Sequence, residues 1–357
     1  MFLDQIMIYP LKSGKGRSLA EAVVHPWGLE GDRRWAVVDE RGDNLWLGEF
    51  PRLASVAADS TPEGGLRLAA RGMEHLTVPP ATGPTTPVGF SGLDRAVLAD
   101  DPAHAWFSEL LGRPARLVWL DDPGRRSIDP AHGGLPGEVV SFAWDAPLLL
   151  ISESSARALD EWLAEEAALH GEEAPVLGQS AFGRSDSPFV QGESAFVQGE
   201  SGFGQGESGF GQGESAFGRD EAAFPGGGGP GRSERGGSGS VGPGEGRFAG
   251  GGAVRDAGVP VRLSRVRFRP SVIIEGAEAF AEDRWSEVRI GTVPFRVSEL
   301  CDRCAVTTID PETQVKGKEP LRTLARHRKW DGRTWFGIRL VPLELGRIRV
   351  GDPVSAR

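Results

Sequence analysis

The chain has 357 residues, of which 39% are hydrophobic and 25% charged, with a formal net charge of −10. This length favours two domains, and the composition is ordinary for a globular protein. No apolar run approaches the roughly 20 residues of a membrane-spanning helix, no basic-then-apolar signal pattern opens the chain, and two cysteines exclude a disulfide framework. We therefore expect a cytoplasmic protein with no membrane partner. Because no basic stripe is present, we also expect no nucleic-acid partner.

Short segments rich in β-branched and aromatic residues dominate the first part of the chain. One helix is expected over 105–111. Strands are expected over 2–9, 20–25, 34–39, 52–57, 66–69 and 115–120. Short strands at this spacing predict a small barrel or a curled sheet.

The second ordered part is also rich in strands. Helices are expected over 152–170 and 319–328. Strands are expected over 147–151, 271–275, 287–290, 305–309, 336–341 and 347–350. No glycine-rich phosphate-binding motif follows a strand, so the nucleotide-binding α/β folds fit poorly. The fold class that we expect is α+β, mainly β, with a few helices.

The composition changes between residues 178 and 252. Glycine is concentrated there, with 25 of the chain's 51, and phenylalanine recurs every seven residues from Phe182 to Phe217. Glycine inside each unit excludes a coiled coil, and so little apolar surface cannot offset the entropy of ordering. We predict a long disordered insertion. The alternative is an array of weak phenylalanine contacts.

The segment Cys301-Asp302-Arg303-Cys304 is the densest chemical signal in the sequence. A structural zinc site would need further ligands, and the strand-like residues 305–309 do not suit a thioredoxin-like pair, which stands at a helix N-terminus. Two interpretations stay open on these residues alone. The thiols are buried and inert, or one is a thiolate ligand to a metal held partly by a group other than protein.

Four separated stretches resemble one family when they are taken together. They are Ile8-Tyr9-Pro10-Leu11-Lys12-Ser13-Gly14-Lys15-Gly16, Gly31-Asp32-Arg33-Arg34-Trp35, Arg267-Phe268-Arg269-Pro270-Ser271 and Cys304-Ala305-Val306-Thr307-Thr308-Ile309-Asp310-Pro311, and Gly351-Asp352-Pro353-Val354 follows in the same style. In this order the stretches resemble MOSC-domain proteins with a MOSC N-terminal β-barrel domain, the group that includes the mitochondrial amidoxime-reducing component and its bacterial relatives.

The resemblance implies a domain plan and a cofactor. A MOSC N-terminal β-barrel domain would span 1–120, and a discontinuous MOSC β-barrel domain would span 121–177 and 253–357. The cofactor would be molybdenum bound to molybdopterin, with Cys304 as the protein ligand of the metal. Cations and hydroxyls that would hold the pterin and its phosphate are Lys12, Ser13, Arg33, Arg269, Ser271 and Arg303. Ser271 stands where the family usually has asparagine, and Asp145-Ala146 replaces residues that are hydroxylated in the animal relatives.

The activity implied by the resemblance is a two-electron reduction that removes oxygen from N-hydroxylated small molecules. Two cysteines cannot bind an iron–sulfur cluster of their own, so electrons would come from a separate flavin or iron–sulfur protein. The alternative function is a sulfur carrier or cofactor-handling protein with a persulfide on Cys304. A third hypothesis is a binding module that has lost its chemistry and interacts through the phenylalanine repeat.

Deleting residues 178–252 is expected to leave folding and activity largely intact, because closure entropy grows only logarithmically with loop length. Thermal unfolding and activity of the shortened chain, beside those of the full chain, test this expectation. Loss of folding would show that the segment is not a dispensable loop.

Overall fold

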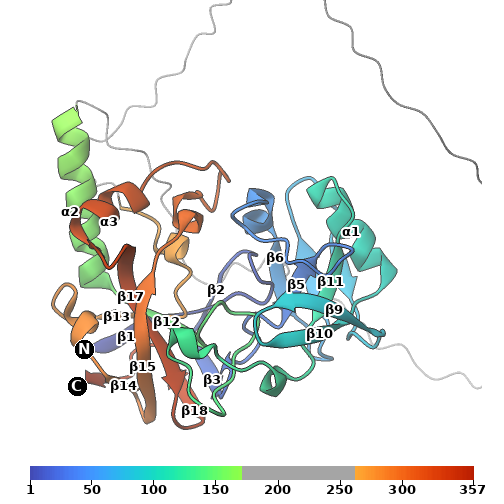
Figure 1. The fold of residues 1–357 in the computed structure, drawn as a ribbon, viewed down its shortest axis with the longest axis horizontal. Coiled ribbons are helices and arrows are strands. Elements are labelled where there is room, and N and C mark those ends of the chain that lie inside the picture. Colours follow the sequence, from blue (N-terminus) through green and yellow to red (C-terminus); the bar gives the residue numbers. More distant parts are fainter. Residues whose placement is uncertain (171–261) are drawn as a thin grey trace, which may run out of the picture. The chain divides into compact units, whose positions relative to one another are not determined.

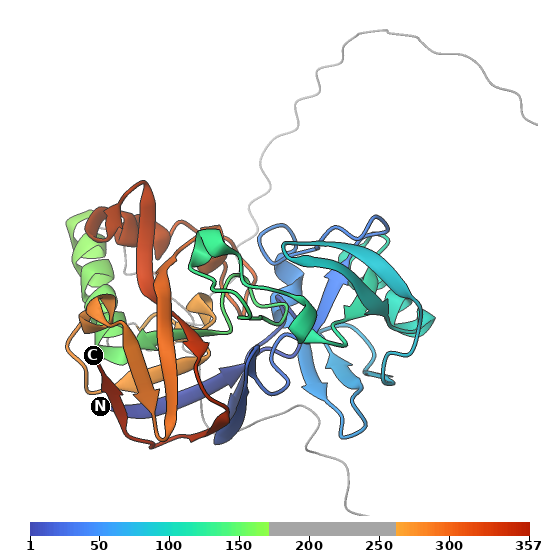
Figure 2. The same ribbon diagram turned by 60° about the horizontal axis from the view of Figure 1, so that its bottom comes forward.

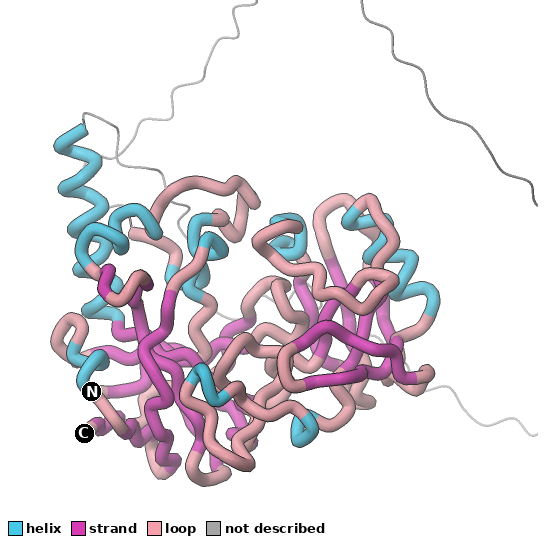
Figure 3. The backbone as a smooth tube through the Cα atoms, in the orientation of Figure 1, coloured by secondary structure: helices cyan, strands magenta, loops and turns pink. Residues whose placement is uncertain are grey.

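The structure, a computed structural model, describes residues 1–170 and 262–357, all of which fall in one compact unit. The predicted disordered insertion at 178–252 lies outside the described residues. Strands dominate the regular structure of the described part, which has three α-helices (Figures 1 and 3). The expected α+β, mainly β class is confirmed. None of the described helices is long and apolar enough to cross a membrane.

The largest sheet has nine strands drawn from both ends of the chain. All neighbours are antiparallel except β12 and β13, which are parallel. Its order is β19 (Val354–Ala356), β14 (Glu287–Ile290), β15 (Val293–Asp302), β17 (Arg333–Pro342), β12 (Leu148–Ser152), β13 (Val272–Glu275), β1 (Phe2–Ile8) and β2 (Arg17–Leu19), with β16 (Lys329–Trp330) paired to β17.

Three smaller sheets complete the strand pairing. One has the order β5 (Trp35–Val38), β11 (Arg116–Trp119), β10 (Leu93–Leu98) and β9 (Thr85–Phe90). The others have the orders β18 (Gly346–Arg349), β3 (Glu21–His25), β4 (Gly28–Leu29), and β6 (Ala57–Ser60), β7 (Leu66–Ala69), β8 (Leu76–Val78).

The first strands of the chain pair with strands from its second half. β1 pairs with β13, and β3 pairs with β18. The amide of Val354 also donates to the carbonyl of Met1 (2.9 Å), and Figure 2 shows the two chain ends close together. Two of the four sheets therefore contain strands from both sides of residue 120, and the domain boundary expected there stays a prediction.

The three helices pack against strands of these sheets. α1 (Asp101–Leu111) begins at Asp100, whose side chain accepts the amide of Ala103, and ends at Gly112 in the left-handed region (φ 67). α2 (Glu153–His170) and α3 (Leu321–His327) pack against β12, β13 and β17 (Figure 1). Because β12 and β13 are parallel, the chain must cross over between them, and α2 begins that crossover.

An arginine fixes the segment that returns to the structure after the crossover. Arg265 binds Glu153 of α2 through Nη2 (2.8 Å) and Asp160 of α2 through Nη1 (2.9 Å). Asp160 also accepts the amide of Leu263 (2.9 Å). The segment before β13 is therefore attached to the first half of α2.

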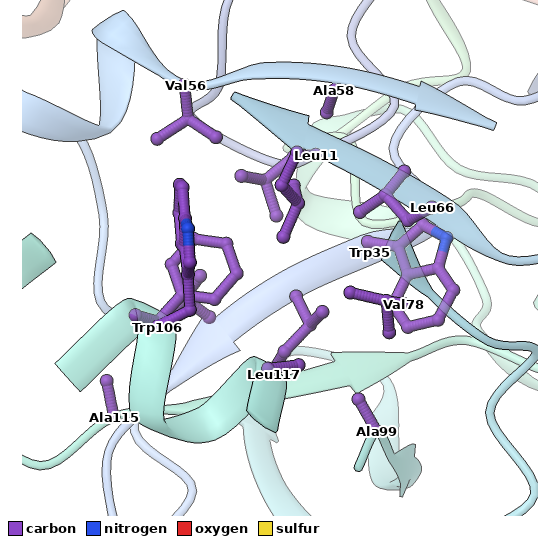
Figure 4. Packing of buried hydrophobic residues seen from close by; sticks show 14 of the residues in the cluster. Leu11, Trp35, Val56, Ala58, Leu66, Val78, Ala99, Trp106, Ala115 and Leu117 are labelled. Carbon is purple, nitrogen blue, oxygen red and sulfur yellow. The ribbon is translucent and has the colours of Figure 1, made fainter. Parts of the chain in front are cut away.

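One apolar core lies under the smaller sheets of the first part. Leu11, Trp35, Val56, Leu66 and Leu117 are buried in it, and Figure 4 shows their side chains converging. A second core lies against the largest sheet and includes residues of β1, β12, β15 and β17. The chain passes from the second core to the first directly after β1.

One expected strand is wrong in this part. Residues 52–57 were expected to be extended, but Pro51–Ser55 form a 3₁₀ helix and the strand β6 begins only at Ala57. Proline sets the backbone φ angle that suits the first residue of a helical turn, and the hydroxyl of Ser55 donates to the carbonyl of Arg52 (2.7 Å). These local interactions outweigh the apolar pattern.

Arg265→Met is expected to lower the free energy of unfolding by about 3 kcal/mol, because it leaves two mostly buried carboxylates unpaired. Urea unfolding measures the change. The control is Arg347→Met, whose ion pair with Glu21 is exposed and should matter little. Equal effects of both substitutions would contradict the role of Arg265.

Candidate functional site

The segment after β1 is anchored on both sides of Lys12. Ile8 is buried in the core of the largest sheet, whereas Leu11 is fully buried in the core of Figure 4. The amide of Lys12 donates to the carbonyl oxygen of Trp35 (2.8 Å). Because its neighbours pack into two cores, Lys12 is held in place by the fold itself.

The Lys12 ammonium is bound by a carbonyl oxygen and by aromatic rings. Nζ donates to the carbonyl of Phe142 (2.7 Å) and lies 5.7 Å from the ring centre of Phe90 and 5.3 Å from that of Trp144. Within residues 1–170 and 262–357, no carboxylate forms an ion pair with Lys12. Burial and neighbouring guanidinium groups lower the pKa of Lys12 well below its usual value.

Next to Lys12, a tyrosine ring lies between two guanidinium groups. Tyr9 is fully buried, and the Cζ atoms of Arg33 and Arg269 lie 4.6 and 4.1 Å from its ring centre. Asp32 accepts the amide of Tyr9 (2.7 Å) and forms an ion pair with Arg33. Burial raises the pKa of Tyr9 to about 12 and lowers the pKa of Arg269 to about 10.

The two arginines also contact each other's segments. Arg33 Nη2 donates to the carbonyl of Arg269 (3.2 Å), and Arg269 Nη1 donates to the carbonyl of Gly14 (2.9 Å). Both residues have left-handed backbones, with φ of 50° and 55°, a strained conformation that clusters at functional sites. The Nη2 atom of Arg269 is buried without a hydrogen-bond partner. The structure thus brings the predicted residues Lys12, Arg33 and Arg269 together.

Sequence reasoning missed a fourth buried cation, Arg126. Its guanidinium donates to the carbonyl oxygens of Ser91 (3.0 Å), Ala143 (2.6 Å) and Trp144 (3.1 Å), and also to that of Ser141. Burial lowers the pKa of Arg126 to about 10. A single arginine in a loop gives no sequence signal, because its partners are main-chain carbonyls, which every residue type has.

Positive charge exceeds negative charge in this cluster. Two carboxylates, Asp32 and Asp145, influence the pKa values of the cations. The cations are Lys12, Arg33, Arg126 and Arg269. Buried charges normally have a partner, so this cation cluster is suited to hold an anion such as a phosphate.

Cys304 is exposed two residues after the end of β15, whereas Cys301 is buried near the end of that strand. Between them, Arg303 donates from Nη1 to the Cys301 sulfur (2.9 Å) and from Nη2 to the carbonyl of Phe268 (2.8 Å). Phe268 precedes Arg269 of the cation cluster. The predicted residue Arg303 therefore connects the cysteine segment to that cluster, and its charge also lowers the pKa of Tyr9, against the larger effect of burial.

The strand expected over 305–309 is wrong. Ala305–Thr308 form a 3₁₀ helix, and Cys304 precedes its first residue. The hydroxyl of Thr307 donates to the carbonyl of Cys304 (3.0 Å), and that of Thr308 to the carbonyl of Ala305 (2.7 Å). Threonine side chains that bond to the nearby main chain compete with strand pairing, and here they stabilise the turn.

The two predicted serines contact the main chain instead of the cation cluster. Ser13 Oγ accepts the amide of Leu47 (3.1 Å), and Ser271 Oγ accepts the amide of Leu149 (3.3 Å). Both serines are buried, and each hydroxyl still has a proton to donate. Their roles toward a cofactor stay predictions.

A second cluster of charged side chains, also missed by sequence reasoning, surrounds Arg339. Its guanidinium binds Glu299, Asp302 (2.7 Å) and Asp145 (3.1 Å), and it lies 3.3 Å from Nδ1 of His132. Burial alone would lower the pKa of Arg339, but the surrounding acidic groups raise it. Glu299 and Asp302 share β15, but His132, Asp145 and Arg339 come from three other segments, so no spacing in the sequence indicates the five residues together.

Neither the cation cluster nor the cluster around Arg339 is a metal site made of protein ligands alone. Within the described ranges, no three histidine, cysteine or carboxylate side chains are placed to hold a metal ion. The arrangement instead offers one exposed thiol in a segment that Arg303 connects to a set of buried cations. A metal here would need donors from a group other than protein.

Two family descriptions match the chain. "MOSC N-terminal beta barrel domain" matches residues 1–114, and "MOSC domain" matches residues 253–355. The first match agrees with the predicted N-terminal β-barrel domain. Lys12 and Arg33 lie in the first matched range, and Arg269 and Cys304 lie in the second.

Three curated proteins are similar over most of the chain. Human "Mitochondrial amidoxime-reducing component 1" is 40% identical over 371 residues, which cover 98% of this chain and 81% of that protein. "Mitochondrial amidoxime reducing component 2" of Rattus norvegicus is 25% identical, with 99% of this chain and 82% of that protein covered. "Molybdenum cofactor sulfurase" of Danio rerio is 25% identical, and the match spans 95% of this chain but only 31% of that protein.

Inorganic phosphate is expected to stabilise the cofactor-free chain, because a ligand of the native state adds about 2.7 kcal/mol at 100 times its dissociation constant. Lys12→Met should remove much of that gain. Lys15→Met is the matched control, because Lys15 is exposed and pairs with Glu312. Thermal unfolding in phosphate and in chloride of equal ionic strength measures the effect, and equal gains in both variants would contradict the anion site.

Proposed function

Because the chain belongs to the family of MOSC proteins with a MOSC N-terminal β-barrel domain, we propose that it is a molybdenum-cofactor-dependent reductase of N-hydroxylated small molecules. The similarity to amidoxime-reducing components over almost the whole chain supports this activity. The net reaction takes up two electrons and two protons, breaks the N–O bond, and releases water together with the N–H product.

One observation supports the proposal most strongly. The exposed thiol of Cys304 lies in a segment that Arg303 connects to the buried cations. An exposed thiol can coordinate a metal that another molecule brings, whereas the buried thiol of Cys301 is already bonded to Arg303. Uncompensated cations beside a soft sulfur ligand match a cofactor that has both a phosphate and a metal.

The residues present fit the molybdenum cofactor. Arg269 Nη2 and Arg303 Nε are buried donors without a hydrogen-bond partner among the described residues, and buried donors normally have one. Lys12, Arg33 and Arg269 would neutralise the phosphate and bind the pterin edge, and Cys304 would be the protein ligand of the metal. When bound, the cofactor supplies the two-electron redox chemistry that removes the oxygen.

The chain's own residues would bind the cofactor and orient it. The guanidinium groups of Arg33 and Arg269 are fixed against the Tyr9 ring, so they meet an anion without rearranging. The 3₁₀ helix after Cys304 and the bond from the Thr307 hydroxyl to the Cys304 carbonyl fix the backbone from which the thiol extends. Electrons would come from a separate flavin or iron–sulfur protein, because the two cysteines of the chain cannot hold an iron–sulfur cluster.

A second candidate function is a sulfur carrier with a persulfide on Cys304. The exposure of this thiol and the similarity to a molybdenum cofactor sulfurase favour it. Cyanide-releasable sulfur on a chain that holds no molybdenum would support the carrier. Near-stoichiometric molybdenum in protein from a cofactor-producing host would support the reductase.

Cys304→Ala is expected to abolish N-reduction, because it removes the proposed metal ligand. Cys301→Ala should have a smaller effect, because Cys301 contacts Arg303 instead. The measurements are benzamidoxime reduction with reduced methyl viologen as electron donor, and molybdenum content by mass spectrometry. Equal losses in both variants would overturn the assignment of the ligand.

A further inference from the structure

His132 lies between two carboxylates and partly in solvent. It ends a 3₁₀ helix over Pro130–His132, and 25% of its side chain is exposed. Its Nδ1 is 3.1 Å from Oε1 of Glu299, and its Nε2 is 3.7 Å from Oδ2 of Asp145. Imidazole is the side chain best suited to exchange protons near neutral pH.

Asp145 is the partner of His132 on the side of the cation cluster. It directly follows Trp144, whose ring lies over the Lys12 ammonium. Burial raises the pKa of Asp145, while the charges of Arg339 and His132 oppose that rise. A carboxyl group with a raised pKa can hold a proton and release it.

Arg339 connects this pair to the cysteine segment. It binds Asp145 (3.1 Å) and Asp302 (2.7 Å), and Asp302 lies two residues before Cys304 in the chain. Asp145 thus has the cation cluster on one side and, through Arg339, the segment of the thiol on the other. His132 approaches it to 3.7 Å from the partly exposed side.

The proposed reaction consumes two protons in each turnover, and the group that supplies them must be protonated again from water. Lys12 is buried and its ammonium is bonded to the Phe142 carbonyl, so a proton that it gave up could not be replaced directly from water. The arginines stay protonated. His132 combines contact with solvent and contact with a carboxyl group near the cluster.

We propose that His132 and Asp145 form the proton path of this site, with His132 taking protons from water and Asp145 passing them toward the N–O oxygen. This inference rests on the proposed reductase function. The charged groups that face the pair belong to several packed segments. They are Glu299, Asp302, Arg339, Arg126 and Lys12.

The first test uses the full chain without cofactor. Carbon-detected NMR of the Asp145 carboxyl group measures its pKa in the wild type, in His132→Gln and in His327→Gln. His132→Gln should raise the pKa of Asp145 further, because the positive imidazole lowers it in the wild type. His327→Gln is the matched control, since His327 also lies near a carboxylate, 3.9 Å from Glu166. An unchanged Asp145 titration in His132→Gln would overturn the coupling.

The second test uses molybdenum-loaded protein, with reduced methyl viologen as electron donor and benzamidoxime as substrate. His132→Gln should lower kcat about 100-fold, a usual loss for a missing proton donor, while KM and molybdenum content stay near wild type. His327→Gln should keep the wild-type kcat. Added imidazole should restore activity to His132→Ala, which a merely structural role would not allow.

The outcomes separate the two proposals. Wild-type protein that is loaded with molybdenum but reduces no N-hydroxylated substrate would overturn the reductase and, with it, the proton path. An active wild type with an unchanged kcat in His132→Gln would overturn the proton path alone. Thermal unfolding of each variant confirms that the protein measured is folded.

Discussion

The proposed cofactor site depends on buried cations that outnumber the carboxylates beside them. Taking an ammonium or a guanidinium group out of water costs free energy, and here main-chain carbonyls and aromatic faces offset that cost. Lys12 uses the Phe142 carbonyl, and Arg126 uses four carbonyl oxygens. Such partners satisfy the donors but leave the charge uncompensated. An anionic ligand would therefore meet a preformed positive electrostatic potential and would bind without rearranging the protein.

The fold tolerates the free-energy cost of burying these cations because apolar packing fixes the residues beside them. Leu11, next to Lys12, is fully buried in one core, and Ile8 is buried in another. Phe268, next to Arg269, packs with Phe336 at a ring distance of 4.4 Å. This packing fixes the backbone from which the side chains of Lys12 and Arg269 extend. Hydrophobic burial thus stabilises the arrangement that electrostatics alone would disfavour.

The sequence predicted the strands that alternate cleanly, such as β14 and β7, and the motifs that meet at Lys12, Arg33 and Arg269. It failed at residues 52–57 and 305–309, where a proline or threonine hydroxyls stabilise local turns that an apolar pattern does not reveal. Arg126 and Arg339 were missed for another reason. Their partners are main-chain carbonyls and residues from distant segments, so only the folded chain brings them together.

The backbone between Ser141 and Asp145 joins the two charged groups. Lys12 and Arg126 bind its carbonyl oxygens from the side of the cation cluster, while the Asp145 side chain turns to Arg339 and His132. A short, fixed segment therefore separates a positive region, suited to an anion, from an acidic region, suited to moving protons. The proposed reduction, which binds an anionic cofactor and consumes protons, would use both regions within one site, with Asp145 close enough to act on the charges of Lys12 and Arg126.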